Sequence, residues 1–266
     1  NLTARLQKIN GKKVSIGSEV EMAKVKQSLT GAVYKVESIT TKEKKKNPVP
    51  PFTTSSMQQE AYRKAGYTTK KTMQIAQQLY EGIELGKEGV VGLISYMRTD
   101  STRISEQAMT SLRVFIGEVY GEKFVPAKPR EFAVKGKVQN AHEAIRPTSV
   151  YRTPSQMKPY LKPVQYKLYK LIWERFVASQ MSAAVLDATT VDIKAADCLF
   201  RSSGSVVRFP GFMQVYMEGK DENETSETDA EATGNLPAVK ANQELSLKEL
   251  LSNQHFTQPP FRYTEA

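Results

Sequence analysis

Most of the helical periodicity in this 266-residue chain lies in its middle, and strand-like patterns lie on both sides of it. Apolar residues recur at helical spacing in successive stretches between Phe52 and Met181. Before them, a short helix beginning after Ser18 is followed by a strand pattern at Val33–Ile39. After them, alternating stretches rich in Val and Thr run from 186 to 209. This order predicts an α+β fold in which a mainly helical domain is inserted into a β-rich domain.

The predicted domain boundaries follow these changes of pattern. Residues 1–51 and 182–254 are assigned to a discontinuous β-rich domain, and residues 52–181 to the helical domain. Residues 255–266 are expected to begin a further domain, in which the chain stops. The charged and then proline-rich run Lys42–Pro51 is expected to be an extended connection between the domains.

Local signals predict individual elements within these domains. Thr54, Ser55 and Ser56 offer N-caps for the first helix of the helical domain. The apolar run Val90–Met97 is expected to form a buried strand. In the second half, Ser203–Gly204 is a turn signal. The acidic run at 218–231 is expected to be a mobile surface loop, and a strand-like pattern returns over 236–251.

Composition narrows the kind of protein and the kind of partner. Lys plus Arg number 38 against 28 Asp plus Glu, and the net charge of +10 suggests a polyanionic partner such as nucleic acid. Ordinary solubility charge is the alternative.

The single cysteine, Cys198, allows neither a disulfide within the chain nor a thiol metal cluster, which favours a cytoplasmic protein. The sequence contains no apolar run near the roughly 18 residues of a membrane span. Because the chain begins at Asn1 without an initiator Met, we expect a piece of a longer protein.

The most informative stretch is SYMRTDST at residues 95–102, where a tyrosine ends an apolar run and polar residues follow at once. A phenol is a weak nucleophile near neutral pH, because its ordinary pKa is about 10, but nearby positive charge activates it. Arg98 lies two residues after Tyr96, so in an extended segment both project to one face. The Arg98 guanidinium could also hold a phosphate oxygen. This pair suits attack on a phosphodiester, although a packed sheet tyrosine followed by a solvated arginine gives the same local pattern.

A second stretch, NAHEAIRPT at residues 140–148, contains one of the two histidines. His142 can hydrogen-bond a phosphate or orient a neighbouring acid, although a lone histidine is more often a surface or capping residue. Arg146 adds a second cation, and Pro147 restricts Arg146 to an extended conformation. The other histidine, His255, opens the last twelve residues.

Together these stretches resemble bacterial type IA DNA topoisomerases across nearly the whole chain. GLISYMRTDS at residues 92–101 resembles the active-site segment of that family, and HEAIRPT at 142–148 resembles its downstream histidine motif. PFTTSSMQQ at 51–59 is similar to the segment that leads into the tyrosine domain, and residues 255–266 to the return into the base domain. One departure is Phe261, where the family often has Pro or Ala.

The resemblance implies a chemistry and assigns residues to it. Tyr96 would attack a phosphodiester of single-stranded DNA, form a 5′-phosphotyrosine bond and so allow relaxation of negative supercoils without a nucleotide cofactor. Arg98 would stabilise the scissile phosphate, and His142 would support DNA binding. Arg146 would have a weaker, structural role, while Thr99 and Asp100 would either orient Arg98 or form a simple turn.

The resemblance also implies that part of the active site is absent from this sequence. The family's metal-binding domain carries a Glu in a strand and a later Asp-x-Asp, and this signature is not found here. Mg²⁺ would therefore be bound by that domain of the full-length enzyme and by no residue of this chain. The implied partners are single-stranded and negatively supercoiled DNA together with the metal-binding domain, and no membrane. The implied enzyme is a monomer associated with the nucleoid in the bacterial cytoplasm, and this piece alone is expected to be inactive in relaxation.

Competing hypotheses come from other classes of protein. One is a single-stranded DNA-binding module without covalent chemistry, which mutation of Tyr96 to Phe would distinguish. Another is a different tyrosine-using DNA enzyme. Recombinases need more Arg and His residues around the tyrosine, and rolling-circle nucleases need paired metal-binding histidines, whereas the two histidines here are far apart in sequence.

Overall fold

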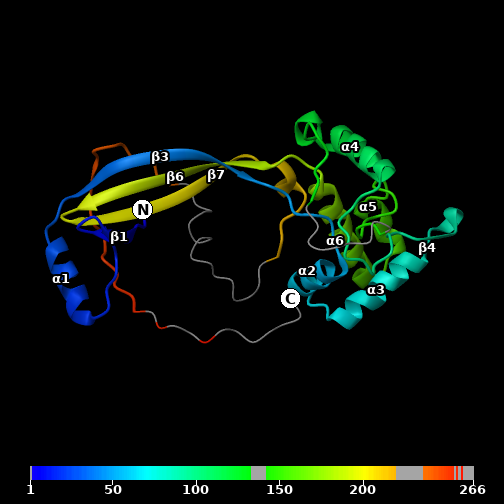
Figure 1. Ribbon diagram of the computed structural model, residues 1–266, viewed down its shortest axis with the longest axis horizontal. Coiled ribbons are helices and arrows are strands. Elements are labelled where there is room, and N and C mark those ends of the chain that lie inside the picture. The colour runs from blue at the N-terminus through cyan, green and yellow to red at the C-terminus, as the bar shows by residue number, and fades with distance from the viewer. Residues whose placement is uncertain (1, 133–141, 220–235, 255, 257–258, 260–266) are drawn as a thin grey trace. The chain divides into compact units, whose positions relative to one another are not determined.

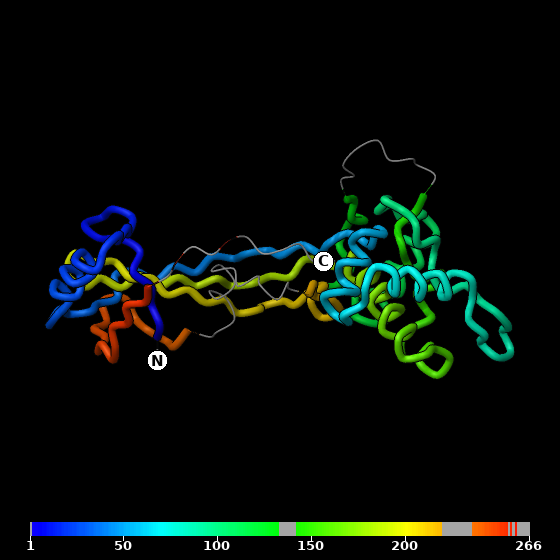
Figure 2. The backbone as a smooth tube through the Cα atoms, turned by 90° about the horizontal axis from the view of Figure 1, so that it is seen from below, coloured from blue at the N-terminus to red at the C-terminus, as the bar shows by residue number. Residues whose placement is uncertain are grey.

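The computed structural model describes residues 2–132, 142–219, 236–254, 256 and 259. The chain divides into two compact units, drawn as a ribbon in Figure 1 and as a tube in Figure 2. The first unit contains the described residues of Asn1–Lys45, Val185–Arg208 and Thr225–Pro260. The second contains those of Lys46–Ala184 and Phe209–Glu224. Mixed helix and strand content confirms the predicted α+β class.

A six-stranded sheet with the order β2-β1-β7-β6-β3-β8 forms the first unit within the described residues. Its three longest strands, β3, β6 and β7, run side by side (Figure 1). β1 pairs antiparallel with β2 and β7, and β3 pairs antiparallel with β8. The strand bounds are β1 Arg5–Ile9, β2 Lys12–Lys13, β3 Tyr34–Lys46, β6 Ala184–Ala195, β7 Cys198–Phe209 and β8 Glu244–Leu245.

One end of this sheet carries the core of the first unit. Val191, Ile193 and Ala195 alternate along β6 and are buried, as expected for a strand with one face covered. The helix α1, Glu19–Leu29, begins at the N-cap Ser18, whose hydroxyl accepts from the backbone N–H of Glu21. The remaining members of this core are Leu29, Tyr34, Val36, Cys198 and Phe200.

Several predictions for the first unit are wrong in detail. β3 continues through Lys46, so the basic run at 42–46 is part of a strand, and only residues 47–51 of the expected connection lie outside it. Exposed pairs support it, with the Thr41 and Thr189 hydroxyls 3.0 Å apart and Glu43 paired with Arg208. Ser203–Gly204 lies inside β7, and the turn falls at Ala196–Asp197, where Ala196 has a φ of +48°. Of the strand-like pattern over 236–251, only β8 forms a strand.

The second unit is a helical assembly around α6, Pro163–Ser179, which is buried along much of its length. Leu168, Ile172 and Phe176 are at most 2% exposed, and Pro163 occupies the first turn, where its fixed φ suits a helix. The other helices are α2 Thr54–Ala65, α3 Thr69–Glu81, α4 Glu106–Tyr120 and α5 Pro154–Met157. Short 3₁₀ turns are η1 Gly86–Glu88, η2 Glu122–Phe124, η3 Lys158–Tyr160 and η4 Gly211–Gln214. None of the described helices is long and apolar enough to span a bilayer.

The predicted strand at Val90–Met97 is largely absent. Val90–Val91 forms the two-residue strand β5, which pairs with β4, Ile83–Glu84. Beyond Gly92 the chain bends at Ser95 and Met97 and joins no ladder with any residue that the structure describes, and its backbone partners come from separate segments. Leu93 donates to the carbonyl of Leu79 at 2.7 Å, and Ile94 forms an isolated bridge with Pro147. The run is buried only in part, because Leu93, Ile94 and Met97 are at most 1% exposed whereas Val90 and Tyr96 are 68% and 45% exposed.

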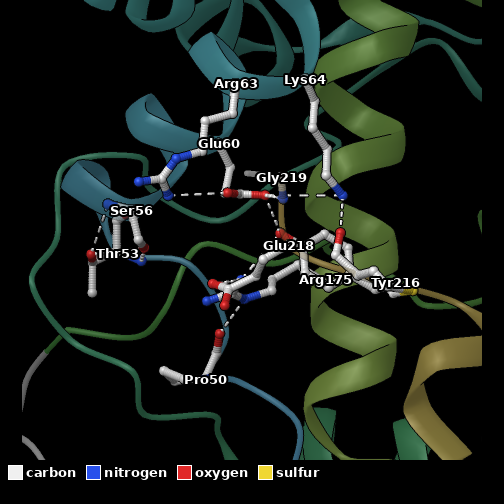
Figure 3. Close-up of polar contacts among 11 residues, drawn as sticks. Pro50, Thr53, Ser56, Glu60, Arg63, Lys64, Arg175, Tyr216, Glu218 and Gly219 are labelled. Atoms are coloured by element: carbon white, nitrogen blue, oxygen red, sulfur yellow. Dashed lines mark hydrogen bonds and ion pairs between the residues drawn. The ribbon is translucent and has the colours of Figure 1, made fainter. Parts of the chain in front are cut away.

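A buried polar network joins the segment at Pro50 and the segment at residues 216–219 to helices α2 and α6 (Figure 3). The carboxylate of Glu60 accepts from the Tyr216 hydroxyl at 2.6 Å and from the backbone N–H of Gly219 at 3.0 Å. Arg175 donates to the Tyr216 hydroxyl at 3.1 Å, to Glu218 at 2.8 Å and to the carbonyl of Pro50 at 2.6 Å. These bonds satisfy buried charges that would otherwise destabilise the fold. They also hold the segments at Pro50 and at Gly219 against the helices.

Candidate active site

Along the tyrosine segment, residues 95–101, the backbone bends at Ser95 and Met97, and side chains from Tyr96 onward alternate between solvent and core. Tyr96 is 45% exposed, and Arg98 and Asp100 are also exposed. Met97 and Thr99 are 1% and 8% exposed, because they point into the second unit. Tyr96 and Arg98 are therefore both on the outward side of this alternation, as the spacing of two residues predicts.

The N-terminus of α2 supports the backbone of the tyrosine segment. The Thr54 hydroxyl donates to the carbonyl of Met97 at 2.7 Å and accepts from the backbone N–H of Thr99 at 2.8 Å. The backbone N–H of Thr54 donates to the carbonyl of Thr99 at 2.9 Å. The sequence predicts Thr54–Ser56 as N-caps, but the N-cap is Thr53, whose partner in the capping box is Ser56 (Figure 3). The Thr54 hydroxyl is consequently available for the tyrosine segment.

The histidine segment, residues 142–148, lies antiparallel beside the start of the tyrosine segment. Ser95 donates from its backbone N–H to the carbonyl of Arg146 at 2.9 Å. The Ser95 hydroxyl donates to the carbonyl of Ala144 at 2.7 Å and accepts from the backbone N–H of Arg146 at 3.0 Å. Ile145 forms a bridge with Phe52. Two stretches about fifty residues apart in sequence, as the Ser95–Ala144 separation of 49 shows, are thus held together immediately before Tyr96.

A cleft of about 260 Å³ opens where the two segments meet. It is lined by Ser95, Tyr96, Thr99, His142, Glu143 and Arg146. Four of the predicted site residues therefore share one cleft, and all of them belong to the second unit. Arg98 and Asp100 are exposed on the same segment but do not line the cleft. His255 lies outside the described residues.

The cations of the site differ in how they are paired. Arg146 is held by Glu143, whose Oε2 accepts from Nε at 2.8 Å and lies 2.7 Å from Nη2. Arg146 also donates to the carbonyl of Pro147 at 3.1 Å. By contrast, the Arg98 guanidinium makes no hydrogen bond or ion pair with any residue that the structure describes. Arg98 is therefore the cation better able to receive an anion from solution, whereas the Arg146 charge is already partly neutralised.

Thr99 and Asp100 show no contact that would orient Arg98. The Thr99 hydroxyl accepts from the backbone N–H of Ser101 at 3.0 Å, and the Ser101 hydroxyl accepts from the backbone N–H of Arg103 at 3.1 Å. These successive side-chain-to-backbone bonds shape the turn that follows the tyrosine segment. Asp100 has no ion pair among the described residues.

Sequence reasoning missed several residues that build the site. The Tyr80 ring, on α3, meets the Tyr96 ring edge to face with centroids 5.4 Å apart. The Arg103 side chain donates from Nε to the carbonyl of His142 at 3.5 Å, a long contact. The backbone carbonyl of Arg103 accepts from the backbone N–H of Ala144 at 2.8 Å. The spacing of Glu143 and Arg146 was the available signal for their ion pair. The sequence indicated Thr54 only as a candidate helix N-cap and did not indicate Tyr80, because the site partners of both residues are distant in sequence.

The described residues do not form a metal site. No cluster of three or more His, Cys, Asp or Glu side chains in the described ranges could hold a metal ion. Glu143 is the carboxylate among the residues that line the cleft, and it is already paired with Arg146. The donor set therefore does not fit a divalent cation, which prefers several oxygen ligands.

Comparison with known proteins places this chain in a family of DNA-processing enzymes. Residues 2–266 match a family model described as DNA topoisomerase, and the chain belongs to that family, which confirms the resemblance seen in the sequence. Its relatives are type IA enzymes. It is 47% identical over 275 residues to DNA topoisomerase 1 from two strains of Xylella fastidiosa, matching 100% of this chain and 33% of each relative.

A solved structure gives the same result. Full-length topoisomerase I from Thermotoga maritima matches with a TM-score of 0.70 and 36% sequence identity, covering 91% of this chain and 36% of that chain. This chain thus spans about one third of the length of the relatives that it matches.

Proposed function

We propose that this chain is the strand-cleaving part of a type IA DNA topoisomerase that relaxes negative supercoils, with Tyr96 as the nucleophile. The observation that supports this most is the exposed phenol at a cleft, two residues from an exposed arginine that has no ion pair with any described residue. Membership of the topoisomerase family and the net charge of +10 support DNA as the partner. We propose that the substrate is a single-stranded region of negatively supercoiled DNA.

The proposed reaction is a reversible transesterification. The Tyr96 oxygen attacks a backbone phosphorus, the phenol proton is lost, and a new bond joins tyrosine to the 5′ phosphate. The bond from phosphorus to the 3′ oxygen breaks, and that oxygen takes up a proton as it leaves. Attack by the same 3′ hydroxyl later restores the strand. One phosphodiester replaces another, so no nucleotide cofactor is required.

Each predicted site residue receives a role in this proposal. Arg98 would bind the scissile phosphate and stabilise charge that develops on its oxygens. His142, exposed at the rim of the cleft, would contact DNA. Arg146 would be structural, since Glu143 already pairs with it. Thr99 would shape the turn, and Asp100, on the face of Arg98, would orient that guanidinium once DNA is bound.

We also propose that magnesium is bound by a part of the parent protein outside this chain, because the described residues do not fit a metal. No step assigned above to this chain involves the metal. The chain alone would then bind single-stranded DNA but not relax a supercoiled plasmid. We further propose a monomer that acts on chromosomal DNA in the bacterial cytoplasm. The domain assignment, with arch segments at 1–51 and 182–254, the tyrosine domain at 52–181 and the start of a base domain at 255–266, remains a proposal of the same kind.

The test uses an end-labelled single-stranded oligonucleotide with magnesium and denaturing gels. The full-length protein, its Tyr96→Phe variant and this chain alone would be compared, with oligonucleotide binding measured in parallel. We expect a covalent adduct with the full-length protein, loss of that adduct with unchanged binding in Tyr96→Phe, and binding without an adduct for this chain. Binding without an adduct in every sample would instead favour a single-stranded DNA-binding module. An adduct that survives Tyr96→Phe would exclude Tyr96 as the nucleophile.

A further inference from the structure

We propose that Thr54 is a positioning residue for strand cleavage, which sets the orientation of Tyr96 and Arg98 through the backbone between and after them. This inference rests on the proposed function of Tyr96. It assigns a task to a hydroxyl that the sequence marks only as a helix cap, and it extends the site to the N-terminus of α2.

The first observation is that Thr54 contacts the inward residues that flank Arg98. Its hydroxyl donates to the carbonyl of Met97 and accepts from the N–H of Thr99, and its backbone N–H donates to the carbonyl of Thr99. A further contact of 3.1 Å joins the hydroxyl to the Thr99 carbonyl. The peptide groups on both sides of Arg98 are thereby bonded to one residue.

The second observation is that Thr54 itself is held firmly. The preceding Thr53 and Ser56 form a capping box, in which the Ser56 hydroxyl accepts from the Thr53 N–H at 2.9 Å. Phe52, fully buried, forms a bridge with Ile145 of the histidine segment. A hydroxyl fixed on a capped helix defines the position of its partners better than one on a free loop would.

The third observation is that the tyrosine segment has no strand ladder to hold it. Beyond the bridge at Ile94, no regular pairing continues through residues 95–101 in the described structure. Ser95 is bonded to the histidine segment on one side of Tyr96, and Thr54 supplies the bonds on the other side. Without Thr54, the backbone from Met97 to Thr99 would lose those contacts, and Arg98 would lose its fixed base.

A small misplacement at this point matters for chemistry. In-line attack needs the phenol oxygen, the phosphorus and the leaving oxygen to be aligned, and an error of about 1 Å can cost on the order of 100-fold in rate. The role of Thr54 would therefore appear in the cleavage rate more than in the affinity for DNA. Because Thr54 does not line the cleft, its loss would leave the DNA-contacting groups chemically intact.

The experiment uses the full-length protein with Thr54→Val, which keeps the shape of the side chain without the hydroxyl, and Thr54→Ser, which keeps the hydroxyl. Thr72→Val is the matched control, since Thr72 is a fully buried threonine of the same unit that donates to the carbonyl of Thr68 at 2.9 Å, within α3. The readouts are the single-turnover rate of covalent adduct formation, single-stranded DNA affinity, and hydrogen exchange of a peptide that covers residues 96–100.

We expect Thr54→Val to slow adduct formation by about 10-fold to 100-fold with little change in affinity. Thr54→Ser and Thr72→Val should remain close to the wild type. Exchange should rise at the Thr99 amide in Thr54→Val alone. A wild-type rate in Thr54→Val, or an equal slowing in Thr72→Val, would overturn the proposal. If the wild type forms no adduct, the function proposed for Tyr96 fails. The exchange measurement then decides separately, because unchanged protection of residues 96–100 would also remove the positioning role.

Discussion

The Tyr216 hydroxyl donates a 2.6 Å hydrogen bond to the Glu60 carboxylate, and both side chains are only 2% exposed. The same hydroxyl accepts from Arg175 at 3.1 Å, so it lies between a buried anion and a buried cation. Burial raises the pKa of the Tyr216 hydroxyl well above its ordinary value, which keeps it a donor to Glu60. The stability of the second unit should depend strongly on this hydroxyl.

We therefore expect Tyr216→Phe to lower the free energy of unfolding by about 1–3 kcal/mol, because Glu60 and Arg175 each lose a buried partner. Urea unfolding followed by circular dichroism measures this change. Tyr160→Phe is the control, since Tyr160 is 47% exposed and should show a change near zero. Equal stability of the two variants would contradict the role given to the network.

Tyr169 predicts how stability changes at alkaline pH. Its ring is fully buried, its hydroxyl donates to the carbonyl of Arg152 at 2.6 Å, and burial raises its pKa well above the ordinary value of 10.0. In the unfolded chain the phenol loses its proton near the ordinary value, whereas in the folded protein it keeps it. Its contribution to stability is therefore fully present below pH 10 and is lost as the pH rises toward the folded pKa.

Tyr169→Phe should make this alkaline loss less steep, by up to about 1.4 kcal/mol for each pH unit. The variant should be less stable than the wild type near neutral pH, because the bond to Arg152 is gone, and the difference should shrink above pH 10. Denaturant titrations at a series of alkaline pH values would show this. Parallel curves for the two proteins would mean that Tyr169 does not titrate in this way.

We expect position 211 to tolerate no residue larger than glycine. Its φ is +50°, and a Cβ built there would lie 2.6 Å from the carbonyl carbon and oxygen of Ala183. Gly211→Ala should destabilise the second unit by roughly 2–5 kcal/mol, from the left-handed conformation and the backbone clash together. Gly66→Ala separates the two causes, because Gly66 has a φ of +62° with open space around it. Thermal unfolding should show the smaller loss for Gly66→Ala, and the reverse order would be inconsistent with this explanation.

Removal of the Ser95 hydroxyl should slow DNA cleavage without a comparable loss of stability. Ser95→Ala removes the hydroxyl that bonds to Ala144 and Arg146, so the tyrosine and histidine segments should separate slightly. We expect slower adduct formation by the full-length protein, by about tenfold. Ser179→Ala is the control, since Ser179 is a fully buried serine that donates to the carbonyl of Phe176 at 2.6 Å on α6. Equal rates in the two variants would show that the Ser95 bonds are not needed.

The helices of the second unit were predictable because their signals are local. Gly66 is the left-handed C-cap of α2, and Pro163 begins α6, and both are residue types that favour those positions. The run from Val90 to Met97 failed as a strand prediction because an apolar run indicates burial without specifying partners. Its partners, the Thr54 hydroxyl and the segment around Arg146, lie far away in the sequence.

The site was predictable to the extent that the period of two governs it. That period places Tyr96 and Arg98 on one face, and the exposed fractions show the alternation. The neutralisation of Arg146 by Glu143 and the ring contact from Tyr80 require the tertiary fold. Thr54 was hidden for another reason: hydroxyl residues near a helix start usually cap it, and here the neighbouring Thr53 does so.

The alternation in the tyrosine segment also limits how the chemistry of this site could be redesigned. Moving the reactive oxygen one place along the chain, by combining Tyr96→Phe with Met97→Tyr, would direct it into the core, where Met97 is 1% exposed. Moving the reactive oxygen two places would require tyrosine at position 98, and the guanidinium of Arg98 would then be lost. An inserted or deleted residue between the Ser95 and Thr54 bonds would likewise exchange the inward and outward side chains. A new activity would therefore have to come from changing side chains at positions 96, 98 and 100 in their present order.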